Sequence, residues 1–300
     1  EQNPLLFVAG DQLQLIHTAQ DVRDPAASEP AGSPFTMQWT ARLRQQQLAV
    51  AAIDASEPAS WAADAWQPCD DLLPEPAFCR HPPHHLADGS ALLPIYRSLE
   101  QGGAFGHDHS LVLPLNASGR PSAAAVAVPS CIGRVHGSIV AAADGTTLLQ
   151  FFRSRRADRI YRSHSRDQGP SWRAPAPTEL PNNHSSLQAL RLSSGRLAMI
   201  FNRFALHPEP VSGPWGEAAW PRSRWPLAIA LSDDDGDSWP WIRSIDHGDG
   251  FCGDANWPLN GALAYPSIVE GLPGELHIAY SWAGRLAIRY LCLQEEEILG

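Results

Sequence analysis

The chain has 300 residues and a formal net charge of −10, because 32 acidic side chains outnumber 22 basic ones. This negative field disfavours nucleic acid or an anionic membrane surface as a partner, so an anionic ligand would need a local cluster of arginines. No apolar run approaches the roughly 18 residues of a membrane span, and five cysteines without a CxxC pair argue against a disulfide framework or a zinc ribbon.

The pattern of apolar residues predicts an all-β protein. Short strand-like stretches lie at 197–201, 226–231, 276–280 and 286–291, and turn residues bound each of them. No segment keeps a 3.6-residue apolar period over three turns, and the alanine-rich stretch 123–127 is the nearest exception. The 23 glycines and 27 prolines fit a turn-rich chain, and 11 tryptophans supply core volume.

Five stretches share the order strand, tight turn, strand. In chain order they begin N3-P-L-L-F, R80-H-P-P-H-H, H136-G-S-I-V, H184-S-S-L-Q and Y265-P-S-I-V, and they turn at Gly10, Gly89, Gly145, Gly195 and Gly274. The turn glycines are 50 to 79 residues apart, a spacing that suits four-stranded sheets arranged radially. The repeat therefore predicts a β-propeller.

Two octapeptides follow one pattern, S165-R-D-Q-G-P-S-W172 and S232-D-D-D-G-D-S-W239. We expect each to form a turn between outer strands, in which Ser and Asp bond local backbone groups, Gly takes a positive φ and Trp packs into the sheet. A calcium site in the acidic run 233–235 is disfavoured, because calcium takes 6–8 oxygen ligands and a short hairpin presents few.

These octapeptides are Asp-boxes. With G-R-V-H-G-S-I-V, F-F-R-S-R-R-A-D-R-I-Y-R-S, P-L-A-I-A-L-S and Y-P-S-I-V, nearly the whole chain resembles the bacterial and plant sialidase-like (BNR/Asp-box neuraminidase) family. The resemblance implies one six-bladed β-propeller domain over residues 1–300, with the active site where the innermost strands converge. It also implies an exo-α-sialidase-like glycoside hydrolase that acts on an anionic glycan and uses no cofactor or metal. In that family a tyrosine nucleophile works with a glutamate, an aspartate acid/base and three arginines that grip the sialic acid carboxylate.

The catalytic pair implied by the resemblance is Tyr265 and His136. Tyr265 lies where the family's nucleophilic tyrosine begins its Y-S motif, nine residues before its turn glycine. His136 stands nine residues before Gly145, at the family's glutamate position. A neutral imidazole there could accept the tyrosine proton near pH 7.

Five arginines are candidates for binding the substrate. Arg153 and Arg224 match the family's second and third arginines. Arg97 and Arg203 lie eight residues after their turn glycines, and Arg80 lies nine before Gly89, so the repeat geometry is expected to bring these three toward the same face.

The chain departs from the family pattern at its N-terminal end. The first family arginine and the aspartate acid/base belong to a blade that has no counterpart here, so we expect that blade to precede Glu1, to come from an insertion such as 19–79, or to be missing from this branch. The first residue is Glu1 rather than Met, which fits a removed signal peptide or a fragment.

Other interpretations stay open. The histidines of H81-P-P-H-H85 and H107-D-H109 are interpreted as loop residues, because tetrahedral zinc needs three or four ligands. One alternative function is a propeller hydrolase or lyase that acts on another acidic glycan with His136 as acid/base. A second is a glycan-binding propeller without turnover, and one propeller fold hosts many functions.

Overall fold

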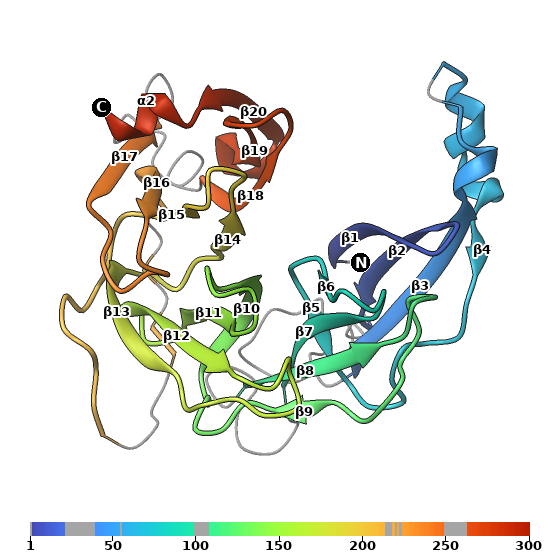
Figure 1. Ribbon diagram of the computed structural model, residues 1–300, viewed down its shortest axis with the longest axis horizontal. Coiled ribbons are helices and arrows are strands. Elements are labelled where there is room, and N and C mark those ends of the chain that lie inside the picture. The colour runs from blue at the N-terminus through green and yellow to red at the C-terminus, as the bar shows by residue number, and fades with distance from the viewer. Residues whose placement is uncertain are drawn as a thin grey trace, which may run out of the picture. The chain divides into compact units, whose positions relative to one another are not determined.

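The computed structural model describes residues 2–21, 40–54, 56–98, 108–213, 218–219, 221, 224–248 and 263–300, and these residues form five antiparallel sheets (Figure 1). The chain divides into two compact units, Glu1–Ala127 and Val128–Gly300. His107 and Cys252 lie outside the described residues.

The first unit contains two sheets, β1-β2-β3-β4 and β5-β7-β8-β9, and the short β6 also pairs with β7. Pro82 and Pro83 separate β5 from β6, which follows from the missing amide hydrogen of proline. The elements of this unit are β1 (Gln2–Ala9), β2 (Gln12–Ala19), β3 (Arg42–Ala49), η2 (Val50–Ala52), η3 (Pro58–Trp61), η4 (Ala63–Ala65), β4 (Gln67–Pro68), β5 (Phe78–Cys79), β6 (His84–His85), β7 (Ala91–Arg97), β8 (His109–Leu115) and β9 (Val126–Ala127).

The second unit contains three sheets, β10-β11-β12-β13, β14-β15-β16-β17 and β18-β19-β20. Its elements are β10 (Arg134–Ala141), β11 (Leu148–Ser154), β12 (Arg159–Ser165), β13 (Ala176–Pro181), β14 (Gln188–Arg191), β15 (Leu197–Asn202), β16 (Leu227–Ser232), β17 (Trp241–Asp246), β18 (Ala264–Glu270), β19 (Glu275–Trp282), η6 (Ala283–Arg285), β20 (Ala287–Gln294) and α2 (Glu296–Leu299).

The continuous apolar run L197-A-M-I-F201 forms a strand that is buried on both faces. Leu197, Met199 and Phe201 pack against the sheet that begins with β10, whereas Ala198 and Ile200 pack against the sheet that begins with β18. Side chains of a strand alternate between its two faces, so one apolar run serves two cores. The middle sheet of the unit is therefore sandwiched between the other two.

The five predicted hairpins are confirmed. Each turn glycine has a positive φ, from 60° at Gly10 to 87° at Gly195, which glycine adopts at little cost. The strands expected at 197–201, 226–231, 276–280 and 286–291 correspond to β15, β16, β19 and β20. The alanine-rich stretch 123–127 ends in the short strand β9.

Both Asp-boxes form the predicted turns between outer strands. In the second box, Asp234 accepts hydrogen bonds from the Ser232 hydroxyl at 2.7 Å, the Ser238 amide at 2.9 Å and the Ser238 hydroxyl at 2.6 Å. The Ser232 hydroxyl in turn accepts from the Gly236 amide at 2.8 Å. Asp167 has the same bonds to Ser165 and Ser171 in the first box.

The box tryptophans are buried, as expected. Trp172 is 6% exposed, and Trp239 is 3% exposed and lies edge-on against Phe151 with ring centroids 6.2 Å apart. The first box follows the C-terminal end of β12 and the second follows that of β16. Because the strands are antiparallel, each box lies at the end of its sheet opposite to the start of β10 or β14.

The fold is an all-β propeller type with five blades among the described residues, so the expected count of six blades is not confirmed. None of the helices in the described part of the chain is both long and apolar enough to cross a membrane.

We expect Asp234→Ala to lower the free energy of unfolding by about 1–2 kcal/mol, because the substitution removes a charged acceptor of three hydrogen bonds. The neighbouring Asp233→Ala is the matched control, since Asp233 is exposed, and its effect should stay within about 0.5 kcal/mol. Urea denaturation at neutral pH measures both values. Equal losses for the two variants would contradict the structural role of the box.

Candidate functional site

Three side chains of the second unit lie at or just before the start of the innermost strand of each of its three sheets. His136 lies at the start of β10, His184 precedes β14, and Tyr265 lies at the start of β18. Each has a positive φ, at 54°, 62° and 55° respectively, which is uncommon for a residue with a side chain. The inner strands β10, β14 and β18 contact one another in this order, so the three side chains gather at one end of the unit.

β-Bulges direct two of these side chains. The pairing register of β10 with β11 shifts between Val135 and Ser138, and that of β18 with β19 shifts between Ala264 and Ser267. A bulge re-aims the side chain that it carries. Gly137 leaves room for the buried Gln150 side chain, which would have to move if a Cβ atom were added beside His136.

A buried asparagine holds the backbone of His184. The Asn182 side-chain oxygen accepts hydrogen bonds from the Ser154 and His184 amides, both at 3.0 Å, and its amide group donates to the Ser185 carbonyl at 3.1 Å. A left-handed residue with a side chain costs about 1–3 kcal/mol and persists only where its surroundings fix it. Asn182, in the connection between β13 and β14, supplies that restraint and ties it to Ser154 of β11.

Arg153 and Ser186 flank the imidazole of His136. Arg153 Nη1 lies 3.4 Å from both ring nitrogens, so this contact is not a directed hydrogen bond to either one. The Ser186 hydroxyl lies 3.3 Å from Nδ1. His136 is 4% exposed and Arg153 is 2% exposed, so a cation and an imidazole share a space that water barely reaches.

Two arginines face the ring of Tyr265. The guanidinium carbon lies 5.7 Å from the ring centroid for Arg224 and 5.2 Å for Arg285, and the His136 ring centroid is 6.3 Å away. Burial lowers the pKa of Arg224, and the interaction with Tyr265 opposes that lowering. The two guanidinium groups therefore place positive charge beside the tyrosine ring.

Asn202 ties Arg224 to the strand of Tyr265. Its side-chain amide donates to the Arg224 carbonyl at 2.8 Å and to the Leu263 carbonyl at 3.0 Å. The Leu263 amide also donates to the Arg224 carbonyl at 3.1 Å. The backbone of Arg224 is thus bound to Leu263, which lies two residues before Tyr265 in the chain.

Hydrogen bonds determine the tautomer of His184. Arg155 Nη1 donates to Nε2 at 2.9 Å, so Nε2 carries the lone pair, and Nδ1 must then donate to the Ala219 carbonyl. Burial lowers the pKa of His184 well below its ordinary value, with further lowering from Arg153 and Arg155. His184 is therefore a neutral side chain with both ring nitrogens engaged.

The described parts of the connection between β15 and β16 close over this site. The Ala219 amide donates to the Arg155 carbonyl at 2.8 Å, and the Leu206 amide donates to the Ala157 carbonyl at 2.9 Å. The same connection carries Arg224. One loop therefore covers the turn after β11 and delivers an arginine to the centre.

The structure brings together four of the seven residues that the sequence singled out, His136, Arg153, Arg224 and Tyr265. Arg203 is exposed, and among the described residues its side chain makes none of the contacts that join these four. Arg80 and Arg97 belong to the first unit, where the Arg97 side chain donates to the Pro76 carbonyl at 3.1 Å.

Sequence reasoning missed three members of the group, Arg155, His184 and Arg285. Alignment on the turn glycine hid His184, which lies eleven residues before Gly195 rather than nine. Alignment on the serine would have found it, since H136-G-S, H184-S-S and Y265-P-S place the three residues in one column. Arg155 follows Arg153 by two residues but lies one residue past the end of β11, so the alternation of strand side chains could not place it in the cluster.

The central cluster, defined as His136, Arg153, Arg155, His184, Arg224, Tyr265 and Arg285, combines four guanidinium groups, a phenol and two imidazoles. Planar guanidinium groups bind carboxylates bidentately, and a buried setting strengthens that attraction. The cluster can hold an anionic group beside a phenol and an imidazole.

Comparison with known proteins adds a family and a fold. The model of the BNR repeat-like domain matches residues 1–278. A comparison with curated protein sequences finds no match.

Solved structures of similar fold include sialidases. A Hadza microbial sialidase is 15% identical, with a TM-score of 0.65 over 98% of this chain and 52% of that one. The Trypanosoma rangeli sialidase in complex with sialic acid is 12% identical, with a TM-score of 0.59 over 99% of this chain and 45% of that one. A protein of unknown function from Dyadobacter fermentans is 15% identical, with a TM-score of 0.66 over 98% and 76%. The chain spans about half the length of the two sialidases.

A buried histidine beside Arg80 in the first unit offers a test of the electrostatics. His81 is 1% exposed, and neither ring nitrogen has a hydrogen-bond partner among the described residues. Burial, with a smaller contribution from Arg80, lowers its pKa well below 6.5. His81 therefore stays neutral in the folded protein at neutral pH.

We expect His81→Leu to reduce the acid sensitivity of the fold. Below about pH 6.5, His81 binds a proton in the unfolded chain but stays neutral in the folded protein. The wild type therefore loses folding free energy as the pH falls below that value. Between pH 7 and pH 5 the free energy of unfolding should fall by about 1–2 kcal/mol less in the variant than in the wild type. Urea denaturation at the two pH values measures this. The exposed His85→Leu is the control and should keep the wild-type dependence.

Proposed function

The chain belongs to the BNR repeat-like family, and from the central cluster that it carries we propose that it is a glycoside hydrolase of the exo-α-sialidase type, which removes a terminal sialic acid or a related acidic sugar from a glycan. The proposal rests on one observation. His136, His184 and Tyr265 converge, each has left-handed backbone conformation near the start of an innermost strand, and four arginines surround them.

The arginines give the proposal its substrate class. Sialic acid carries a carboxylate on the anomeric carbon, and Arg153 with Arg224 would bind that group from two sides. The rest of the protein is acidic, with a net charge of −10, so this local positive charge overcomes a field that otherwise repels an anion. One of the similar structures is a sialidase in complex with sialic acid, which supports the same class.

Tyr265 is the proposed nucleophile. It is partly exposed, unlike the buried tyrosines Tyr96 and Tyr280, so a substrate can reach it. Arg224 and Arg285 place positive charge beside the oxygen that attacks the anomeric carbon. As the tyrosine oxygen bonds to that carbon, the glycosidic C–O bond breaks and the aglycone oxygen takes a proton from water. A second water molecule then releases the sugar from Tyr265. A tyrosine nucleophile also avoids bringing a second carboxylate against an anomeric carbon that already bears one.

His136 is the proposed base that takes the tyrosine proton. Both nitrogens of His184 are engaged by Arg155 and Ala219, so a proton transfer to His184 would first have to break a hydrogen bond. The contacts of His136 with Ser186 and Arg153 are longer, at 3.3–3.4 Å. His184 then acts as a neutral support that positions Arg155.

A second function is supported by the same histidine. With an imidazole at the position of the family's glutamate, a hydrolase or lyase reaction on a uronate or other acidic glycan could run with His136 as acid/base. Turnover of uronate glycosides without turnover of sialosides would favour that reaction, and saturable binding without any turnover would favour a glycan-binding propeller.

We also propose that residues 1–300 form one propeller domain and that the complete ring has six blades. The family match spans both compact units, which supports a single domain. Calorimetry should then show one cooperative unfolding transition, because a single domain unfolds as a unit. Two separated transitions would contradict the single domain.

We expect Tyr265→Phe to lower kcat on a fluorogenic α-sialoside by about 10²-fold or more with little change in KM, because the substitution removes only the phenolic oxygen that attacks. His136→Gln should lower kcat by roughly 10²–10⁴-fold. Arg224→Ala should chiefly raise KM, since it removes a partner of the substrate carboxylate.

Tyr290→Phe is the matched control, because Tyr290 is an exposed tyrosine on β20 outside the central cluster. It should keep wild-type kinetics. Wild-type turnover by Tyr265→Phe would show that the tyrosine mechanism is wrong, and a histidine-centred reaction would then be the better account.

A further inference from the structure

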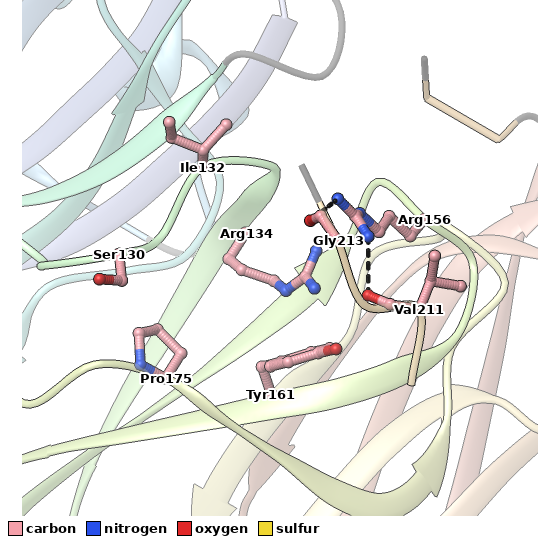
Figure 2. Close-up of a pocket in the computed structure, with 8 residues that line it drawn as sticks. All are labelled: Ser130, Ile132, Arg134, Arg156, Tyr161, Pro175, Val211 and Gly213. Carbon is pink, nitrogen blue, oxygen red and sulfur yellow. Dashed lines mark hydrogen bonds between the residues drawn. The ribbon is translucent and has the colours of Figure 1, made fainter. Parts of the chain in front are cut away.

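A second candidate site, a pocket, lies in the same unit as the central cluster (Figure 2). It has a volume of about 260 Å³, and its lining includes Ile132, Arg134, Arg156, Tyr161, Val211 and Gly213. Pockets for drug-sized ligands measure roughly 300–1,000 Å³, so this volume suits one sugar residue rather than a longer chain.

The pocket adjoins the site through the chain itself. Arg134 lies two residues before His136 on β10, and it pairs in register with Ser154, the residue after Arg153. Arg155 reaches His184 in the central cluster, whereas the next residue, Arg156, reaches the pocket wall. The two sites therefore share one edge of one sheet.

Arg134 forms the floor of the pocket together with Tyr161. Its guanidinium carbon lies 3.7 Å from the centroid of the Tyr161 ring, and Figure 2 shows the guanidinium stacked above that ring. Behind them, the buried Asp158 accepts a hydrogen bond from the Tyr161 hydroxyl at 3.0 Å and lies 3.9 Å from Arg134. Arg134 is thus held in place while its guanidinium remains part of the lining.

Arg156 fixes the opposite wall. It donates to the carbonyl of Val211 at 2.7 Å and of Gly213 at 3.1 Å (Figure 2), and to that of Ser212 at 3.2 Å. The Val211 amide donates to Asp158 at 3.1 Å. Two guanidinium groups line the pocket and one carboxylate lies behind it, so the local charge is positive in a protein whose net charge is −10.

We propose that this pocket is a subsite for a second, negatively charged sugar residue, one that bears a sulfate or a carboxylate and stands next to the sugar held in the central cluster. The choice of a sugar rests on the proposed function. The choice of an anion rests on Arg134 and Arg156, and the size of the group on the pocket volume. The preferred substrate is then a glycan with two adjacent acidic residues.

Titration calorimetry at low salt tests the subsite without any turnover. Galactose 6-sulfate is the sulfate probe and glucuronic acid the carboxylate probe, with neutral galactose and inorganic sulfate as comparisons. We expect one charged sugar to bind at one saturable site at least tenfold more tightly than galactose or inorganic sulfate, and the tighter of the two probes identifies the charged group. Equal binding of galactose would overturn the anionic subsite, and equal binding of inorganic sulfate would overturn the sugar.

Variants place the binding in this pocket. Ile132 is half exposed at the rim, so Ile132→Glu should weaken binding by about fivefold, the factor that a like charge at ~4 Å in water produces. Ile132→Gln has the same shape and should change it by less than about twofold. Arg166→Gln makes the same change in net charge at an exposed residue of the first Asp-box, at the other edge of the sheet, and should also have little effect.

Arg134→Gln should weaken binding at least tenfold, with Arg134→Lys recovering part of the loss. If Arg134→Gln does not fold, the Ile132 pair still decides the question. Equal affinities for Ile132→Glu and Ile132→Gln would overturn the proposal.

Competition separates this subsite from the proposed function. N-acetylneuraminic acid, which the central cluster is proposed to bind, should leave the affinity for the charged sugar in the second pocket unchanged. Displacement of that sugar would mean that both anions share one site, and the second pocket would be rejected. If Ile132→Glu and Arg134→Gln weaken charged-sugar binding in a protein that cleaves no sialoside, the subsite is kept and the proposed function is rejected.

Discussion

In four of the five described sheets, a residue with left-handed backbone conformation lies at or just before the start of the innermost strand, and the site depends on this constraint. His136, His184 and Tyr265 all adopt it, and Asn3 at the start of β1 adopts it as well, with φ of 52°. Each such residue costs about 1–3 kcal/mol, and bulges or asparagine side chains in the neighbouring backbone hold it. Equivalent positions in the repeated sheets therefore have the same strained backbone conformation, whereas the side chain at that position differs from sheet to sheet.

Buried arginines are expensive to desolvate, and the unit holds them by giving each a separate set of partners. Arg155 has the imidazole of His184, Arg156 has three backbone carbonyls, and Arg134 has a tyrosine face and Asp158. Several of these partners come from the connection between β15 and β16. Removal of one partner would leave a buried charge without compensation. The resulting loss of folding free energy is far larger than the net stabilisation that the pair provides.

Stability and chemistry occupy opposite edges of the same sheets. The Asp-boxes close the strands at one edge through carboxylates bonded to serines, and these hydrogen bonds lower the pKa of Asp167 to about 2. Nearby, Asp235 accepts from the Ala143 amide at 3.0 Å and pairs with Arg191, which joins the first two sheets of the unit. The opposite end of the sheets, where β10, β14 and β18 begin, carries the strained residues and the arginines.

The sequence by itself determined the all-β class, the five hairpins, the Asp-box turns and the equivalence of His136 and Tyr265, because each depends on residues close together in the chain and on the two-residue alternation of strands. Only the tertiary structure decided which side chains meet. Arg153 and Arg203 both lie eight residues after a turn glycine, yet β11 continues through Ser154 whereas β15 ends at Asn202, so alternation still directs the first side chain inward and no longer directs the second. Arg155 reaches His184 from the turn after β11 of a neighbouring sheet, and Arg285 reaches Tyr265 from the connection between β19 and β20 within one sheet. These contacts follow from the packing of separate segments and not from the two-residue alternation of a single strand.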